Sequence, residues 1–169
     1  MTEVLNVRDN VTLTSVNVLT GEVKKTKVHN LITKPGEFFL IDALNARANV
    51  IPAYTGSVYL AVGTGSVASN YWLGSLTTEV SGIGNPGREK PDSISRSNQT
   101  VLISTYFDTT AASGALTEAG LFVTGYDSGG TLRPIGPEVG SGILLSYATF
   151  NEVTKDDTNT LTIDWEFNF

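Results

Sequence analysis

The last ten residues of the chain, 160–169, alternate between polar and apolar side chains without interruption. Because the side chains of a β-strand point to opposite faces with a period of two, this pattern predicts a half-buried strand. The apolar face carries Leu161, Ile163, Trp165, Phe167 and Phe169. We expect this face to be a main contribution to the core, and the chain to fold as one compact, β-rich unit.

The composition favours the same fold class. Among 169 residues, 17 are Gly and 6 are Pro, which is typical of many short strands joined by tight turns. A chain of this length buries roughly 70% of its unfolded surface when it folds, enough for a self-sufficient core. We therefore predict a mainly all-β, single domain over residues 1–169. Its expected architecture is a β-sandwich or jelly-roll-like arrangement with one short amphipathic helix.

Charge and residue content exclude several function classes. Eleven basic against 17 acidic residues give a net charge of −6, which argues against nucleic acid as a partner because phosphate binding needs clustered Lys and Arg. The sequence contains no Cys, so disulfides, thiolate metal sites and cysteine nucleophiles are excluded. The polar N-terminus is no signal peptide, and no run approaches the ~18 apolar residues of a membrane span. We expect synthesis in a host cytoplasm and no membrane partner.

The first third of the chain predicts a hairpin and then a helix. Strands are expected at 10–18 and 22–28, the second with three lysines, as on an edge protected against further pairing. A hydroxyl cap at Thr33 and an early proline at Pro35 predict a helix over about 35–48. Its expected apolar stripe is Phe38, Ile41, Leu44 and Ala48. We expect this helix to cover one open side or end of the sheets.

The remaining sequence predicts further strands and one long loop. The strands are expected at 57–62, 100–107, 116–123, 142–150 and 158–169. Residues 66–92 are rich in Gly, Ser and Asn, and loops of this length in a compact domain are usually either functional or disordered. Tyr71 and Trp72 lie in this loop. They are our interface candidates because aromatic residues are enriched in interfaces, although they could equally fold back onto the core.

Residues with catalytic or metal-binding chemistry are scarce. The one histidine, His29, has no partner nucleophile or carboxylate that the sequence singles out. Asp156 and Asp157 lie in a segment without the central Gly of a calcium loop, so we expect a solvated turn. The run Gly63–Ser66 lacks the lysine of a phosphate loop and predicts a turn. We predict no catalytic, cofactor-binding or metal-binding residue, and hence a protein that is not an enzyme.

Glu118 is the residue that most needs a structural explanation. In a regular strand it shares a face with Leu116, Gly120 and Phe122. A carboxylate among apolar neighbours must be hydrogen-bonded or paired, because its isolated burial costs several kcal/mol. We predict a structural pairing with Arg96, Arg88 or backbone N–H groups of the preceding loop.

Several short motifs follow one another along the chain. They are His29–Gly36, Tyr59–Gly65, Leu76–Val80 with Arg88 behind it, Ser104–Phe107, Leu116–Phe122 and the turn that contains Lys155. Their order resembles small virion proteins of tailed bacteriophages, including the N-terminal domain of tail-collar fibre proteins. In those proteins a Val-Gly-x-Gly strand end, a Leu-x-x-Glu segment and a Glu-x-Gly-Leu-Phe strand occur in this order. The resemblance covers roughly residues 28–169.

The resemblance implies a non-enzymatic structural protein of a tailed-phage virion. In the fibre proteins a long fibre follows this domain, whereas this sequence ends after the alternating strand, so we expect an auxiliary component of the head or the tail. It would dock by surface complementarity onto the capsid shell, as decoration proteins do, or onto the tail, collar or baseplate. Expected partners are other virion proteins, in a homo-oligomer or in many symmetric copies. The alternative is a carbohydrate-binding module whose loop aromatics stack on sugar rings.

Overall fold

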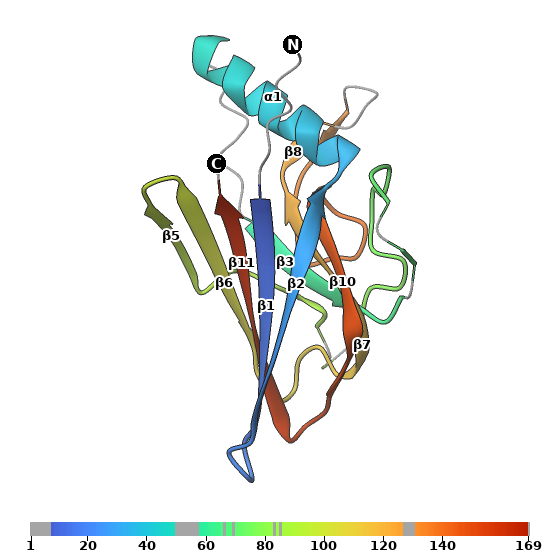
Figure 1. Ribbon diagram of the computed structural model, residues 1–169. Coiled ribbons are helices and arrows are strands. Elements are labelled where there is room, and N and C mark those ends of the chain that lie inside the picture. Colours follow the sequence, from blue (N-terminus) through green and yellow to red (C-terminus); the bar gives the residue numbers. More distant parts are fainter. Residues whose placement is uncertain are drawn as a thin grey trace.

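The structure is a computed structural model, and it describes residues 8–49, 58–65, 67–68, 70–82, 84, 86–126 and 131–168. Within these residues the chain is mostly β, with one α-helix (Figure 1). The elements are β1 (Arg8–Asn17), β2 (Val23–Ile32), α1 (Lys34–Asn49), β3 (Val58–Gly63), β4 (Arg88–Glu89), β5 (Ser93–Ser97), β6 (Thr100–Phe107), β7 (Gly114–Val123), β8 (Gly125–Tyr126), β9 (Leu132–Arg133), β10 (Ile143–Lys155) and β11 (Asn159–Asn168). The predicted all-β class is confirmed.

One curled, nine-stranded antiparallel sheet forms the body of the molecule, in the order β4-β3-β7-β10-β2-β1-β11-β6-β5. β2 connects its two halves. Residues 23–29 of β2 pair with β1, whereas residues 30–32 pair with β10. The two halves diverge from this shared strand, and the main core fills the space between them. The arrangement is therefore sandwich-like, but its two layers belong to one continuous sheet.

The C-terminal strand supplies the core as the alternation predicts. Leu161, Ile163, Trp165 and Phe167 of β11 are all buried, and Phe169 lies outside the described residues. They pack in one cluster with buried side chains of the opposite half of the sheet, among them Leu60, Leu116 and Leu121. Burial of such large apolar side chains is the dominant favourable term in folding.

A second, smaller apolar cluster lies on the outer face of β3, β7 and β10. Its buried members are Ala61, Leu76, Phe122, Leu144 and Tyr147, with Leu73 and Ile135 packed against them. The residues between β3 and β4 and those before β10 therefore cover the outer face of this half of the sheet. Here the sheet is buried on both faces.

The helix covers one end of the sheet, as predicted (Figure 1). The Thr33 hydroxyl accepts a hydrogen bond from the Gly36 N–H at 3.2 Å, which confirms the N-terminal cap. The predicted apolar stripe is wrong at the two positions that can be compared, because Phe38 and Ile41 are exposed. Phe39 and Leu40 pack against the core instead. The side chains of Leu44 and Ala48 lie outside the described residues.

One further expectation is confirmed and another needs correction. The lysine-rich strand is an edge along residues 23–29, close to the predicted 22–28, and it continues into residues 30–32, which join β10. The predicted loop 66–92 contains the strand β4 and a bridge between Gly63 and Glu79. Short strands with few apolar residues, such as β4, β5 and β9, carry no periodic signal and were not predicted from the sequence.

Candidate functional site

Glu118 is fully buried on the outer face of β7 and binds the segment that follows β3. Its carboxylate accepts hydrogen bonds from the Gly65 N–H at 3.2 Å, the Thr77 N–H at 3.1 Å and the Thr78 N–H at 2.8 Å. The Tyr147 hydroxyl donates a fourth, at 2.8 Å. Hydrogen bonds to an ionised acceptor are about twice as strong as neutral ones. One side chain thus anchors two turns of this loop to the sheet.

The predicted pairing of Glu118 is confirmed for the backbone N–H groups and wrong for the arginines. Arg96 lies on the exposed strand β5 and donates to the Asn98 carbonyl at 3.3 Å. Arg88 pairs with a different glutamate, described below. Glu118 shares its face with Gly120 and Phe122, but Leu116 packs in the main core. The register of β7 against β10 shifts between Glu118 and Leu116, and this irregularity breaks the alternation.

Glycines leave room for the Glu118 carboxylate and for the apolar side chains beside it. A Cβ atom on Gly63 or Gly65 would lie 2.5 or 2.4 Å from the Glu118 carboxylate oxygen. A Cβ atom on Gly120 would lie 2.7 Å from Leu144 and 2.9 Å from Leu76. These contacts are too short for any side chain, so the Gly-x-Gly and Glu-x-Gly motifs have a local physical reason. The N–H of Gly65 binds the protein's own carboxylate rather than a phosphate.

Arg88 and Glu79 form a second, buried connection. The Arg88 Nη2 atom donates to Glu79 Oε2 at 2.9 Å, and Arg88 Nε donates to the other carboxylate oxygen. Arg88 Nη1 donates to the Ser141 carbonyl at 2.9 Å and to its hydroxyl at 3.1 Å. The guanidinium lies over the Phe122 ring, 3.9 Å from its centroid. This ion pair joins the loop after β3, the strand β4 and the segment before β10.

Tyr71 joins the same loop to the helix. The Tyr71 hydroxyl donates to Glu37, and the Tyr71 carbonyl accepts from the Lys34 N–H at 2.7 Å. The Lys34 ammonium forms an ion pair with Glu37 at 3.3 Å. Hydrogen bonds to Tyr71 and Glu37 raise the pKa of Lys34, so this group stays a cation. Of the two predicted interface candidates, Tyr71 is therefore half-buried and structural.

Trp72 is the exposed one of the two predicted interface candidates. It is 71% exposed, and its ring meets the Tyr71 ring edge-on, with centroids 5.4 Å apart. It borders an open groove of about 420 Å³. The groove is lined by Lys34, Pro35, Phe38, Trp72, Gly74, Arg133, Gly140, Gly142 and Ile143. The charged residues in this lining are cations, whereas the chain as a whole has a net charge of −6.

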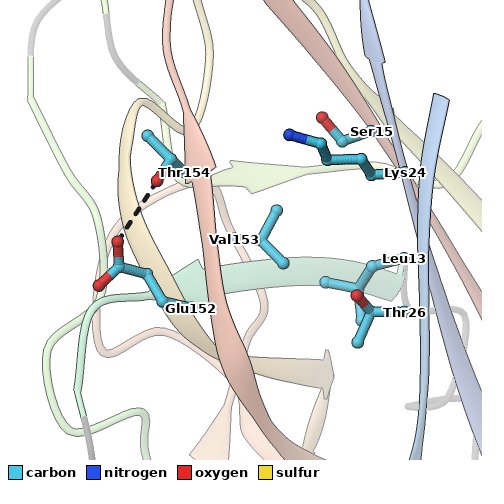
Figure 2. A pocket seen from close by; sticks show the side chains of 7 residues that line it. All are labelled: Leu13, Ser15, Lys24, Thr26, Glu152, Val153 and Thr154. Carbon is cyan, nitrogen blue, oxygen red and sulfur yellow. Dashed lines mark hydrogen bonds between the residues drawn. The ribbon is translucent and has the colours of Figure 1, made fainter. Parts of the chain in front are cut away.

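Another hollow, of about 200 Å³, lies where β2 and β10 separate (Figure 2). It is lined by Leu13, Ser15, Lys24, Thr26, Glu152, Val153 and Thr154. Lys24 pairs with Glu22 at 3.5 Å, and Glu152 accepts from the Thr154 hydroxyl at 3.3 Å. Figure 2 shows Val153 between the Lys24 and Glu152 side chains, which do not converge on one point. We assign this hollow no binding role.

The remaining polar candidates have structural positions. His29 lies exposed on β2, opposite Asn10. The Asp156 carboxylate accepts from the Thr158 N–H at 2.9 Å and from the Asn159 amide at 2.7 Å, which confirms the solvated turn between β10 and β11. Across the part of the chain that the structure describes, no group of three His, Cys, Asp or Glu side chains could hold a metal ion.

The sequence reasoning missed several residues of the site. Tyr147, the hydrogen-bond partner of Glu118, is distant from Glu118 in the sequence. Glu79, the ion-pair partner of Arg88, lies in an irregular segment. Lys155 is 2% exposed at the end of β10. Its ammonium donates to the Asp156 carbonyl at 3.3 Å, and burial lowers its pKa. A lysine in a polar turn gives no sequence signal of burial.

Comparisons with known proteins add no relative. No protein-family model, curated protein or solved structure matches this chain. In the described residues, none of the helical structure has the length and apolar character that crossing a membrane requires.

Proposed function

We propose that this chain is a non-enzymatic structural protein of a tailed-phage virion, which docks through the Trp72 surface onto the capsid shell or the tail. The Trp72 surface comprises Trp72, Phe38, Lys34 and Arg133. The observation that carries the proposal is a tryptophan that is 71% exposed on a loop fixed by partly buried hydrogen bonds. Large aromatic anchors on pre-ordered surfaces are typical of protein interfaces, because little conformational entropy is lost when they bind.

The motif segments support a structural role for the site. The Gly-x-Gly strand end, the Leu-x-x-Glu segment and the Glu-x-Gly strand meet at the Glu118 carboxylate. Arg88, which follows them in the motif order, fixes the same loop through Glu79. All of these polar groups hold backbone in place. None is arranged as a nucleophile beside a general base, which nucleophilic catalysis would need.

The chemistry of the groove indicates the kind of partner surface. Its aromatic and aliphatic lining favours apolar side chains, and the cation Arg133 favours a carboxylate at the rim, whereas Lys34 is already paired with Glu37. We therefore propose that the partner is an acidic, partly apolar patch of another virion protein. Repetition of weak contacts over many symmetric copies would give strong attachment.

Incorporation into particles tests the proposal. We expect Trp72→Ser to fold normally and to be depleted at least tenfold from purified particles of the phage that encodes this chain. Tyr106→Ser is the matched control, because Tyr106 is also exposed but lies on β6, outside the groove. Normal incorporation of Trp72→Ser, or equal depletion of both variants, would contradict docking through this surface.

A carbohydrate-binding module is the second candidate, and the exposed Trp72 ring beside an open groove favours it. A sugar ring stacked on Trp72 would quench its fluorescence, and acidic sugars would also meet the groove's cations. Titration with a panel of neutral and acidic glycans separates the candidates. Saturable quenching that Trp72→Ser removes would replace the virion-docking proposal with glycan binding.

A further inference from the structure

Exposed apolar side chains gather at the turn between β1 and β2. Val18, Leu19 and Val23 flank this turn, and all three are exposed, Leu19 to 77%. We call these three residues the hairpin tip. Single exposed apolar residues are common on protein surfaces, whereas a group of them indicates a contact with another molecule. The hairpin tip is therefore a candidate contact surface.

Hydrogen bonds hold the hairpin tip in one conformation. The Asn17 Oδ1 atom accepts from the Leu19 N–H at 3.0 Å, and the Asn17 carbonyl accepts from the Gly21 N–H at 2.8 Å. The φ angle of Gly21 is +74°, which favours glycine. The Val18 N–H donates to the Thr158 carbonyl at 2.8 Å and so ties this turn to the one between β10 and β11. Because the tip is ordered in advance, little conformational entropy is lost when it binds.

Two carboxylates lie beside the hairpin tip. Asp156 and Asp157 are exposed in the turn between β10 and β11, next to the Thr158 carbonyl that binds Val18. Neither forms an ion pair within the described residues. Lys155, which precedes them, is buried. This end of the molecule thus combines aliphatic side chains with exposed carboxylates.

The lysines of the hairpin leave this combination in place. Lys24 pairs with Glu22 at 3.5 Å, so the two charges offset each other. Lys25 lies two residues beyond Val23, about 7 Å further from the turn along β2.

The groove beside Trp72 has the complementary chemistry. Its lining includes the apolar residues Pro35, Phe38, Trp72 and Ile143 and the cation Arg133. Aliphatic side chains of the tip would pack on the apolar lining, and the carboxylates of the neighbouring turn would meet Arg133. The chain therefore itself presents an acidic, partly apolar patch of the kind that the groove favours.

The hairpin tip and the groove lie at opposite ends of the molecule. Figure 1 shows the turn between β1 and β2 at one end and α1 at the other. β2 runs from Val23 at the tip to Ile32, and Lys34 of the groove lining follows two residues later. Ten residues of strand span roughly 30 Å. A tip therefore cannot reach the groove of its own chain, and only the tip of another copy can occupy it.

We infer that copies of this chain associate head to tail, with the hairpin tip of one copy in the Trp72 groove of the next. This contact rests on the docking role that we propose for the Trp72 surface, and it names a second copy as a partner. Two different patches meet, so the contact is heterologous and can repeat as an open stack. The terminal copy of such a stack keeps a free groove for the capsid shell or the tail.

Sedimentation of the purified protein tests the contact. We expect the parent to form oligomers whose size grows with protein concentration, as mass action requires. Leu19→Asp in the tip and Trp72→Ser in the groove should each give a monomer. Both positions are exposed, so both variants should keep the parent's circular dichroism spectrum. Tyr106→Ser, which removes an exposed aromatic ring from β6, is the control and should assemble as the parent does.

Mixing the two monomeric variants identifies the contact as head to tail. Leu19→Asp keeps an intact groove and Trp72→Ser keeps an intact tip, so an equimolar mixture has one productive contact. We expect a one-to-one heterodimer and nothing larger. A mixture that stays monomeric, or assembly of the Leu19→Asp variant alone, would overturn the tip-in-groove contact.

A charge change tests the choice of partner. We expect Asp157→Lys to weaken the association at least fivefold, because the introduced lysine would face Arg133. Glu152→Lys makes the same change of charge at an exposed position on β10 and should have little effect. Equal effects of the two variants would overturn the charge contact. A monomeric parent would overturn the head-to-tail contact alone, since docking onto particles is measured separately by the incorporation of Trp72→Ser.

Discussion

At residue 118 a single carboxylate takes the position that an external anion would occupy among converging backbone N–H groups. Three amides of one loop point at Glu118, and Tyr147 completes the set. Such converging amides are anion sites in other folds. Here the anion is part of the chain, so the loop is fixed without a ligand. The residue with the clearest chemical signal is therefore a structural one.

Glu118→Gln tests this assignment with almost no change of shape. The amide nitrogen of glutamine would replace one oxygen and face a donor, so the Thr77 N–H would lose its acceptor. A buried donor without a partner costs about 1–3 kcal/mol, and we expect a loss of this size in the free energy of unfolding from urea titration. Glu152→Gln, on the exposed part of β10, is the control and should change it little. Equal stability of the two variants would show that the Glu118 contacts contribute nothing.

Lys155 provides the pH-dependent prediction. Burial lowers the pKa of Lys155 below its ordinary value of 10.5, so the folded state binds this proton less tightly than the unfolded state. Stability from this group therefore rises with pH through the folded pKa and up to the unfolded one. Replacing a buried charge by an apolar side chain is often neutral or stabilising. We expect Lys155→Met to be at least as stable as the parent at pH 7, with a smaller advantage at pH 10.

Urea titrations of both proteins at the two pH values check this expectation. Lys27→Met, on the exposed part of β2, controls for the loss of one positive charge. An advantage of Lys155→Met that grows between pH 7 and pH 10 would contradict the sign of the Lys155 contribution.

At the scale of elements, β11 was predictable and the site was not. Strict alternation depends only on local sequence, and it correctly gave the buried face of β11. The partners of Glu118 and Arg88 come from segments that tertiary folding brings together, so no local pattern identifies them. The helix was found by its cap and proline, but its buried face was assigned wrongly. Phe38, Phe39, Leu40 and Ile41 are all apolar, so periodicity alone could not choose between faces.

Trp165→Ala measures how much β11 contributes to the fold. Trp165 is fully buried between the two halves of the sheet. Large-to-small changes of this kind cost about 3–5 kcal/mol, a large part of a typical total of about 5–15 kcal/mol. We expect most of the variant to be unfolded or to melt far below the parent by circular dichroism. Tyr106→Ala, on the exposed side of β6, should melt close to the parent, and a similar result for Trp165→Ala would remove β11 from the core.

At the scale of the whole molecule, the proposed Trp72 surface lies on the half of the sheet that contains β10. Repetition of one such anchor over many symmetric copies is suited to attachment on a large assembly.

Imaging of the assembled particle is the most direct test of the central claim. The measurement is a high-resolution electron cryomicroscopy map of the proposed phage particle, with the nine-stranded sheet located in the density. We predict that the chain occupies regular positions on the head or the tail, with Trp72 buried against another virion protein. A particle that lacks this chain, or one in which Trp72 faces solvent at every position, would contradict the account.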